Sequence, residues 1–206
     1  LDSSIASPLN IHAPRVIGGS DAKRHEFPYM VSIHPLTTEE HTCGGSIISS
    51  IWILTAAHCC LQSHANGAKD IPLIELITPL RFTDDAVKPI ALPLANETFA
   101  SGWLTSWGIS RRLWFYPVTL QRLEMIIVTN EECKKALTRF KYFYQYPLLD
   151  IMVCSLPLYK GLEAGCSGDS GSPIAHEGVI ISVQSWSVAC VIPKFNAPTV
   201  FTAVSK

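Results

Sequence analysis

Ser170 lies in a stretch of small residues whose types could support covalent chemistry. From Gly165 to Pro173 the chain reads Gly-Cys-Ser-Gly-Asp-Ser-Gly-Ser-Pro, so one hydroxyl stands among glycines and beside a carboxylate. A serine that attacks a carbonyl must be exposed on a tight turn whose backbone N–H groups face the developing oxyanion. Gly168 and Gly171 permit such a turn. The same residues also suit an ordinary Asp-Ser-Gly turn, so partners elsewhere must decide.

His58 is the candidate general base for that serine. It ends the apolar run Leu54-Thr55-Ala56-Ala57-His58 and precedes Cys59, whereas the other six histidines have no comparable setting. A base for serine must be a neutral imidazole held at a strand end within reach of the hydroxyl. A histidine in such a position is more often structural when it stands alone.

Asp70 supplies the third group, because it opens the apolar run Ile71-Pro72-Leu73-Ile74. A buried carboxylate at this point could orient the imidazole and stabilise its cation. The alternative is a simple cap at the start of a strand.

Short apolar runs must position these groups. They are bounded by Gly, Pro, Asn and Asp, and 14 prolines are scattered along the chain, which indicates many short strands. The runs cover 29–33, 46–55, 71–77, 125–129 and 178–182. A helix is expected mainly over 130–140, where Asn130 could cap it. The pattern predicts an all-β sandwich or barrel.

Composition places the chain among compact globular proteins. Of its 206 residues 48% are hydrophobic and 16% charged, and the formal net charge is −1. This balance gives no reason to expect a nucleic acid partner. Without a run of about 18 apolar residues, no membrane span is predicted.

Seven cysteines indicate disulfides in an oxidising compartment, with one thiol left over. Cys-x-x-Cys spacing is absent and Cys59 and Cys60 are adjacent, so no metal site and no cofactor are expected. Asn96-Glu97-Thr98 is a candidate glycosylation site that agrees with secretion.

At this point the chain resembles the chymotrypsin-like, or trypsin-type, serine proteases. The resemblance runs from Arg15 to the C-terminus in the family's motif order. The motifs are Arg15-Val16-Ile17-Gly18-Gly19, Cys43-Gly44-Gly45-Ser46, Thr55-Ala56-Ala57-His58-Cys59, Lys69 to Leu76, Lys88-Pro89-Ile90-Ala91-Leu92-Pro93, Ser106-Trp107-Gly108, Gly168-Asp169-Ser170-Gly171 and Ser185-Trp186-Ser187.

The resemblance implies a role for each matching residue. Ser170 is the nucleophile, His58 the general base and acid, and Asp70 the orienting carboxylate. The backbone N–H groups of Gly168 and Ser170 form the oxyanion hole. Three disulfides are implied, with Cys60 unpaired: Cys43 to Cys59, Cys133 to Cys154 and Cys166 to Cys190.

The resemblance also implies a zymogen. Cleavage after Arg15 frees the amino group of Val16, which in the family turns inward and pairs with the carboxylate that is here Asp169. That ion pair shapes the oxyanion hole, so the uncut chain is expected to be nearly inert.

Counting back from the nucleophile places Ala164 at the floor of the primary pocket, where Arg- and Lys-cleaving members carry an aspartate. A desolvated cation needs a buried carboxylate, so trypsin-like cleavage is not expected. Gly165 keeps one wall open, and Gln184 beside the pocket is unusual. Ser187 and Thr199 stand where wide-pocket members have glycine, which resembles the elastase arrangement and favours small or medium apolar side chains. Ser185 and Trp186 are the other expected substrate-binding residues.

Two departures from the family stand out. Only residues 59–69 separate His58 from Asp70, where the family has several more strands. The chain also ends at Lys206, where the family continues into a C-terminal helix. We therefore expect two packed antiparallel β-barrels of the chymotrypsin-like fold, the first one incomplete. The expected division is an activation leader over 1–15, an N-terminal barrel over 16–93 and a C-terminal barrel over 94–206.

Two functions follow from the resemblance. The first is a secreted, extracellular, glycosylated serine endopeptidase, with protein or peptide substrates, an activating trypsin-like protease and a protein inhibitor as its candidate partners. The second is a catalytically inactive homologue or defective splice isoform that acts, if at all, by binding. Eleven residues at about 3.3 Å each can still join two contacting side chains, so the short segment does not forbid the triad.

Overall fold

The computed structural model describes residues 19–60, 70–83, 85–109, 116–140, 147–157, 166–188 and 198–206. The expected leader, residues 1–15, lies outside these ranges, as does most of the segment between His58 and Asp70. Five residues predicted to form functional sites or disulfides also lie outside them: Arg15, Val16, Ala164, Gly165 and Cys190.

The first sheet is built from four short antiparallel strands in the order β2-β3-β4-β5. Their bounds are Met30–Ile33 for β2, Cys43–Ile47 for β3, Trp52–Leu54 for β4 and Leu73–Glu75 for β5. The run 46–55, expected as one apolar segment, is a hairpin, because the Ser49 hydroxyl accepts the Trp52 N–H and turns the chain. The described strands of this half form an open sheet, as expected for an incomplete first barrel.

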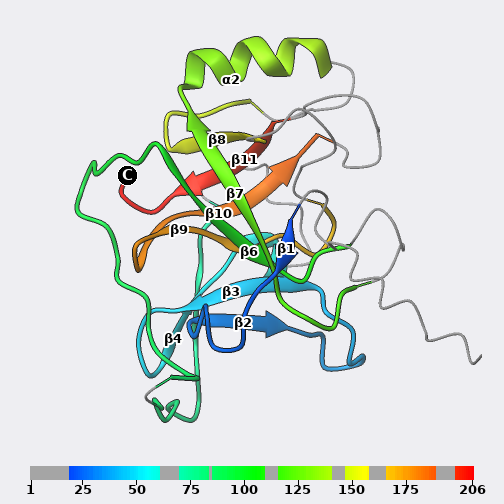
Figure 1. The fold of residues 1–206 in the computed structure, drawn as a ribbon, viewed down its shortest axis with the longest axis vertical. Helices are drawn as coiled ribbons and strands as arrows, with labels where there is room; N and C mark the ends of the chain where they lie inside the picture. The colour runs from blue at the N-terminus through cyan, green and yellow to red at the C-terminus, as the bar shows by residue number, and fades with distance from the viewer. Residues whose placement is uncertain are drawn as a thin grey trace, which may run out of the picture.

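The second sheet closes on itself. Its order is β1-β7-β6-β9-β10-β11-β8, and a further pairing of β7 with β8 closes six strands into a barrel, with β1 attached to β7 (Figure 1). Closure leaves these six strands without a free edge. The bounds are Ser20–Asp21 for β1, Ser101–Ser106 for β6, Gln121–Val128 for β7, Met152–Pro157 for β8, Pro173–His176 for β9, Val179–Ser187 for β10 and Thr199–Ala203 for β11.

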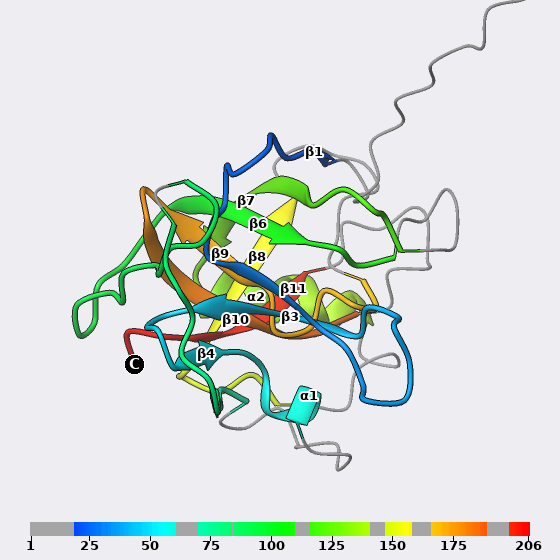
Figure 2. The same cartoon turned by 90° about the horizontal axis from the view of Figure 1, so that it is seen from below.

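The described residues form two α-helices, which lie against these sheets. The helix α1, Ala57–Cys60, follows β4 and carries His58 (Figure 2). The helix α2, Asn130–Leu137, continues into the 3-10 turn η1, Thr138–Phe140, and its Cys133 is disulfide-bonded to Cys154 of β8. None of the helices in the described part of the chain has the length and apolar character needed to cross a membrane.

The expected cap of α2 is wrong by one residue. Thr129, not Asn130, is the N-cap: its hydroxyl accepts the Glu132 N–H, and the Glu132 carboxylate accepts the Thr129 N–H. This reciprocal pair satisfies two backbone donors, which a cap at Asn130 would not do.

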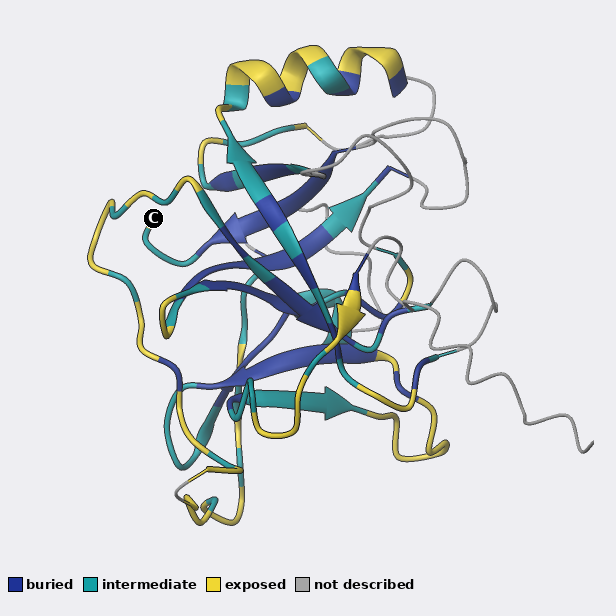
Figure 3. Ribbon diagram, in the orientation of Figure 1, coloured by how far each residue is buried: buried dark blue, intermediate teal, exposed yellow. Residues whose placement is uncertain are grey.

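A hydrophobic core lies between the first sheet and the barrel. Buried Ile47 and Ile53 of the first sheet pack in one cluster with Ala175 and Val183 of the barrel. Figure 3 shows the buried residues gathered on the strands, while α2 presents its exposed side to solvent. Side chains at the ends of these strands are therefore held in place by packing between the first sheet and the barrel.

We expect Thr129→Ala to lower the free energy of unfolding by about 1 kcal/mol, because the Glu132 N–H at the N-terminus of α2 loses its hydroxyl acceptor. Urea denaturation measures the change. Thr129→Ser keeps the hydroxyl and serves as the control; an equal loss in both variants would show that the hydroxyl does not cap the helix.

Candidate active site

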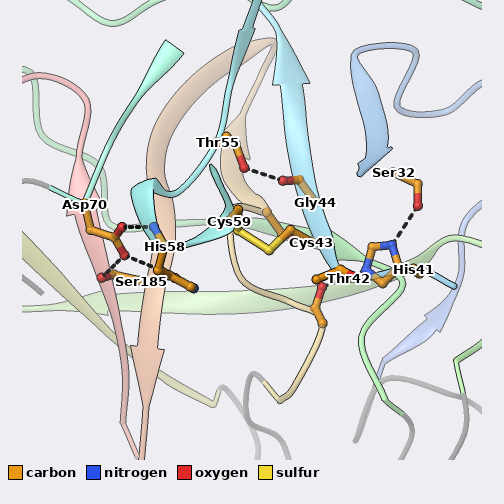
Figure 4. The surroundings of a disulfide bond; sticks show 12 residues. Ser32, His41, Thr42, Cys43, Gly44, Thr55, His58, Cys59, Asp70 and Ser185 are labelled. Carbon is orange, nitrogen blue, oxygen red and sulfur yellow. Dashed lines mark hydrogen bonds and ion pairs between the residues drawn. A yellow bond between two sulfur atoms is a disulfide. The ribbon is translucent and has the colours of Figure 1, made fainter. Parts of the chain in front are cut away.

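His58 and Asp70 form a doubly bonded pair. The Asp70 carboxylate receives the His58 backbone N–H at 3.1 Å through Oδ1, and its Oδ2 lies 2.7 Å from His58 Nδ1 (Figure 4). Because a carboxylate only accepts, Nδ1 carries the proton, and the Nε2 lone pair of a neutral His58 is left free. The His58 side chain is 27% exposed, whereas that of Asp70 is 2% exposed, so the carboxylate is buried and the ring is partly open to solvent.

A third donor completes the Asp70 environment. Ser185 of β10 donates its hydroxyl to Asp70 Oδ2 at 2.6 Å. Burial alone raises the pKa of Asp70, but the hydrogen bonds from His58 and Ser185 outweigh it and hold the pKa below its ordinary value. The sequence identifies Ser185 only as a pocket residue; its hydroxyl is turned toward the carboxylate, and no sequence motif indicated this contact.

The turn over 166–172 presents Ser170. Its backbone is tied to both sheets, because the Gly44 N–H reaches the Ser170 carbonyl at 2.8 Å and the Gly171 N–H reaches the Gln184 carbonyl at 2.9 Å. Gly168 has φ +88° and Gly171 has φ +78°, which favour glycine. At Gly171 a Cβ atom would lie 2.4 Å from the Gly44 carbonyl oxygen, so a larger residue would displace the turn.

The predicted oxyanion donors are available. The N–H groups of Gly168 and Ser170 donate to no acceptor in the described part of the chain, whereas neighbouring amides of the turn are bonded. Among the described residues no hydrogen bond joins His58 Nε2 to the Ser170 hydroxyl. Such catalytic bonds are often long in a free enzyme and tighten when substrate binds.

Asp169 is buried beneath this turn. Its carboxylate receives the N–H groups of Gly108 at 3.1 Å and Cys166 at 2.5 Å. Burial raises the pKa of Asp169 to about 6, although its hydrogen bonds, the one with Ser106 foremost, act in the opposite direction. A Cβ on Gly108 would lie 2.0 Å from the carboxylate, so the Ser-Trp-Gly motif leaves room for it. Val16, its predicted partner, lies outside the described residues.

His41 is a buried residue of this region that sequence reasoning missed. Its Nε2 donates to the Gly168 carbonyl at 2.7 Å, although the two residues are 127 positions apart. It lies two residues before the Cys43-Gly44-Gly45-Ser46 motif, but only the fold shows that it supports the turn.

The pocket residues are placed in part. Ser187 and Thr199 face each other across β10 and β11, and Trp186 is paired with Val200. Gln184 is buried at a β-bulge in β10, and within the described structure its Oε1 accepts no hydrogen bond. The predicted floor, Ala164 and Gly165, lies outside the described residues.

The disulfides fix the framework of the site. The Cys43–Cys59 bond links β3 to α1 beside His58, and Cys133–Cys154 is also present, as the resemblance implies. Cys166 is disulfide-bonded as well, while its predicted partner, Cys190, is not among the described residues. Cys60 is free and exposed, in agreement with the expected odd thiol.

One group of potential metal ligands lies at this site. His58, Cys43 and Cys59 place ligand atoms within 4.8 Å of one another. The two sulfurs are bonded to each other, so they offer no thiolate to an ion.

The closed six-stranded barrel beside an open sheet has the architecture of the chymotrypsin-like fold, and comparison with known proteins gives the family. The Trypsin family model matches residues 16–69 and 61–206. Trypsin II-P29 of Gallus gallus is 28% identical over 241 residues, covering 99% of this chain and 90% of that protein. Coagulation factor XI of Bos taurus is 28% identical over 85% of this chain but only 34% of its own length.

A solved structure has the same fold. Neuropsin, described as a serine protease expressed in the limbic system of mouse brain, superposes with a TM-score of 0.75 at 24% identity, covering 91% of this chain and 94% of its own. The chain therefore belongs to the trypsin family. Its two family matches overlap within 61–69, so the family pattern is interrupted at the short segment between His58 and Asp70.

The raised pKa of Asp169 predicts how the free energy of unfolding changes with pH. The folded chain holds its proton more tightly than the unfolded chain, so the free energy of unfolding should decrease as pH rises from 3.8 to about 6. The full effect is about 3 kcal/mol. Urea denaturation of the uncut chain at several pH values measures it.

Asp169→Asn should flatten that dependence, whereas Asp85→Asn, at an exposed carboxylate, should leave it unchanged. If Asp169→Asn kept the full decrease, the buried carboxyl would not be its source.

Proposed function

We propose that this chain is a serine endopeptidase that hydrolyses peptide bonds through Ser170, His58 and Asp70. The single observation that carries the proposal is the Asp70 carboxylate, which receives both His58 donors and the Ser185 hydroxyl and so leaves His58 Nε2 as a base. The turn that carries Ser170 supports the proposal, because within the described structure the N–H groups of Gly168 and Ser170 donate no hydrogen bond.

The proposed reaction uses these groups in sequence. Ser170 Oγ attacks the substrate carbonyl while His58 Nε2 takes its proton, and the oxyanion is held by the N–H groups of Gly168 and Ser170. His58 then gives the proton to the leaving amine, which breaks the peptide bond. Water, activated by the same imidazole, releases the acyl group from Ser170. Asp70 stays ionised and stabilises the imidazolium.

The proposed substrate preference is for small or medium apolar residues before the cleaved bond. Ala164 offers no carboxylate for a basic side chain, and the facing pair Ser187 and Thr199 supports a narrowed pocket. Gln184 adds a polar atom near this pocket wall, because its buried Oε1 accepts no hydrogen bond within the described structure.

We also propose that the protease is made as a secreted zymogen. Cleavage after Arg15 by a trypsin-like protease would give Val16 an amino group for the carboxylate of Asp169, and the burial and hydrogen bonds of that carboxylate support such a partner. Secretion is supported by the disulfides, and the exposed Asn96 suits glycosylation. Protein substrates and a protein inhibitor are the expected partners.

A second candidate function is binding without catalysis. The interruption of the family match at 61–69 favours it, as does the absence of a hydrogen bond between His58 and Ser170 among the described residues. In that case the chain would be an inactive homologue or defective isoform.

Covalent labelling separates the two candidates. A fluorophosphonate probe should modify Ser170 only after cleavage at Arg15, with the modified peptide identified by mass spectrometry. Ser170→Ala should fold normally and take no label. A folded, correctly cut chain that takes no label would establish the second candidate instead.

Asp70→Asn tests the orienting role. An amide can present its N–H to His58 and hold the wrong tautomer, so kcat should fall about ten-thousandfold, as in trypsin-type triads. Ser185→Ala removes only one of the three bonds and should lower kcat far less. Equal losses in the two variants would contradict the assignment.

A further inference from the structure

Gln184 of β10 carries a buried polar group that the proposed reaction does not use. The residue is 2% exposed, and within the described structure its Oε1 accepts no hydrogen bond. Four buried hydroxyl groups share this state among the described residues, but a hydroxyl can rotate its proton toward a nearby carbonyl. An amide oxygen can only accept, so the buried oxygen of Gln184 needs a donor from elsewhere.

The Gln184 side chain lies on the inner face of the barrel. Gln184 is paired with Phe201 of β11, and residues directly opposite each other on antiparallel strands place their side chains on the same face. The Phe201 ring belongs to an apolar cluster to which every strand of the closed barrel contributes a residue. The carboxamide is therefore enclosed by the barrel. The other members of the cluster include Leu104 of β6, Met125 of β7, Val153 of β8, Ile174 of β9 and Ile181 of β10.

A β-bulge separates Gln184 from the residue that reaches Asp70. The register of β10 against β11 shifts between Gln184 and Trp186, so Ser185 is the extra residue. Its hydroxyl donates to Asp70 Oδ2 at 2.6 Å (Figure 4). Bulges commonly redirect side chains next to functional sites. This bulge turns Ser185 toward the carboxylate and leaves Gln184 facing the inside of the barrel.

The end of the barrel next to Gln184 is lined by hydroxyl groups. Thr199 lies two residues before Phe201 on β11, so the two side chains share the inner face. Thr199 is paired with Ser187 at the end of β10 and with Ser155 of β8, which makes a row of three hydroxyl-bearing residues. Ser187 is only partly buried, whereas Thr199 and Ser155 are buried. The inner face therefore becomes polar toward this end, and Ser187 lies where that face meets solvent.

The same part of β10 lies against the turn that carries Ser170. The Gln184 N–H donates to the Ser172 carbonyl at 2.8 Å, and the Gln184 carbonyl accepts the Gly171 N–H at 2.9 Å. A substrate residue whose carbonyl is attacked by Ser170 would therefore lie close to Gln184.

We propose that the polar end of the barrel receives the substrate side chain before the cleaved bond, and that Gln184 selects a neutral N–H or O–H group on that side chain. This role of Gln184 rests on the proposed function and adds a hydrogen bond to its preference for small or medium side chains. Asparagine and threonine are side chains of this size that carry such a donor. Leucine and valine have nearly the same shapes and carry none.

The selected group is neutral because the residues that line this end of the barrel carry no charge. A cation taken out of water there would find no carboxylate among them. A carboxamide or a hydroxyl both donates and accepts, so it can bond to either end of the Gln184 amide. The residues in question are Gln184, Ser187, Thr199 and Ser155.

Selection arises from the difference between a polar substrate side chain and its apolar counterpart. An apolar side chain leaves the Gln184 oxygen buried without a partner, whereas asparagine or threonine supplies the missing donor. A site with a buried acceptor discriminates against a ligand that lacks the donor. We expect a preference of about tenfold for each polar side chain over its apolar counterpart.

Peptide binding to the Ser170→Ala chain cut after Arg15 tests this role, because the variant cannot cleave what it binds. The probes are short peptides that are identical except at the residue before the cleaved bond, which is asparagine, leucine, threonine, valine or arginine. Isothermal titration calorimetry gives the Kd of each peptide. We expect the asparagine and threonine peptides to bind about tenfold more tightly than the leucine and valine peptides, and the arginine peptide to bind more weakly than the asparagine peptide.

Two further variants of this chain show which group is responsible. Gln184→Met removes the carboxamide but keeps the length of the side chain and its apolar contacts, so the tenfold preference should disappear. Ser182→Ala removes another buried hydroxyl without a described partner from the same strand, and it should leave the preference unchanged. A tenfold preference that survives in Gln184→Met would overturn the role of Gln184.

The unaltered Gln184 side chain provides an independent test. Equal affinity within both peptide pairs, tighter binding of the apolar or arginine peptides, or no binding of any peptide by the folded chain would also overturn the role. The role of Gln184 and the proposed catalysis fail separately. A chain that takes the fluorophosphonate label on Ser170 but shows no preference keeps its catalysis and loses this selectivity. A preference that depends on Gln184 in a chain that takes no label supports the selectivity and removes the catalysis.

Discussion

The Asp70 carboxylate is the point on which the site depends. It receives three hydrogen bonds, two from His58 on α1 and one from Ser185 on β10, so a single buried charge joins the open sheet to the barrel. A buried carboxylate that lost these donors would be strongly destabilised or would take up a proton. The same contacts that keep Asp70 charged also fix the orientation of the His58 ring. The chain therefore orients the proposed base as it folds.

Close backbone packing ties Ser170, the proposed nucleophile, to the first sheet. The Thr55 hydroxyl donates to the Gly44 carbonyl at 2.7 Å, and the Gly44 N–H holds the Ser170 carbonyl. A Cβ on Gly44 would lie 2.1 Å from the Ser172 hydroxyl, so this approach requires glycine. Ser170 is therefore tied to the first sheet through backbone atoms, and the missing strands of that sheet do not remove this anchor.

Local motifs led to the three catalytic candidates, which remain predictions. The family resemblance that those motifs carry implied the two disulfides and the barrel that the structure shows. Contacts between distant side chains were not predictable. The bond of His41 to Gly168 spans 127 positions and has no local signature. The cap was misplaced because Asn130 and Thr129 both suit that position, and only the reciprocal bond with Glu132 distinguishes them.

A crystal structure of the chain cut after Arg15 tests the central claim, that the 59–69 segment is long enough to hold Asp70 against His58. The deciding quantity is the distance from His58 Nδ1 to the Asp70 carboxylate. The account predicts a hydrogen bond of about 2.7 to 3.2 Å, with His58 Nε2 turned toward Ser170. An Asp70 carboxylate turned away from His58, with the ring bonded elsewhere, would contradict it.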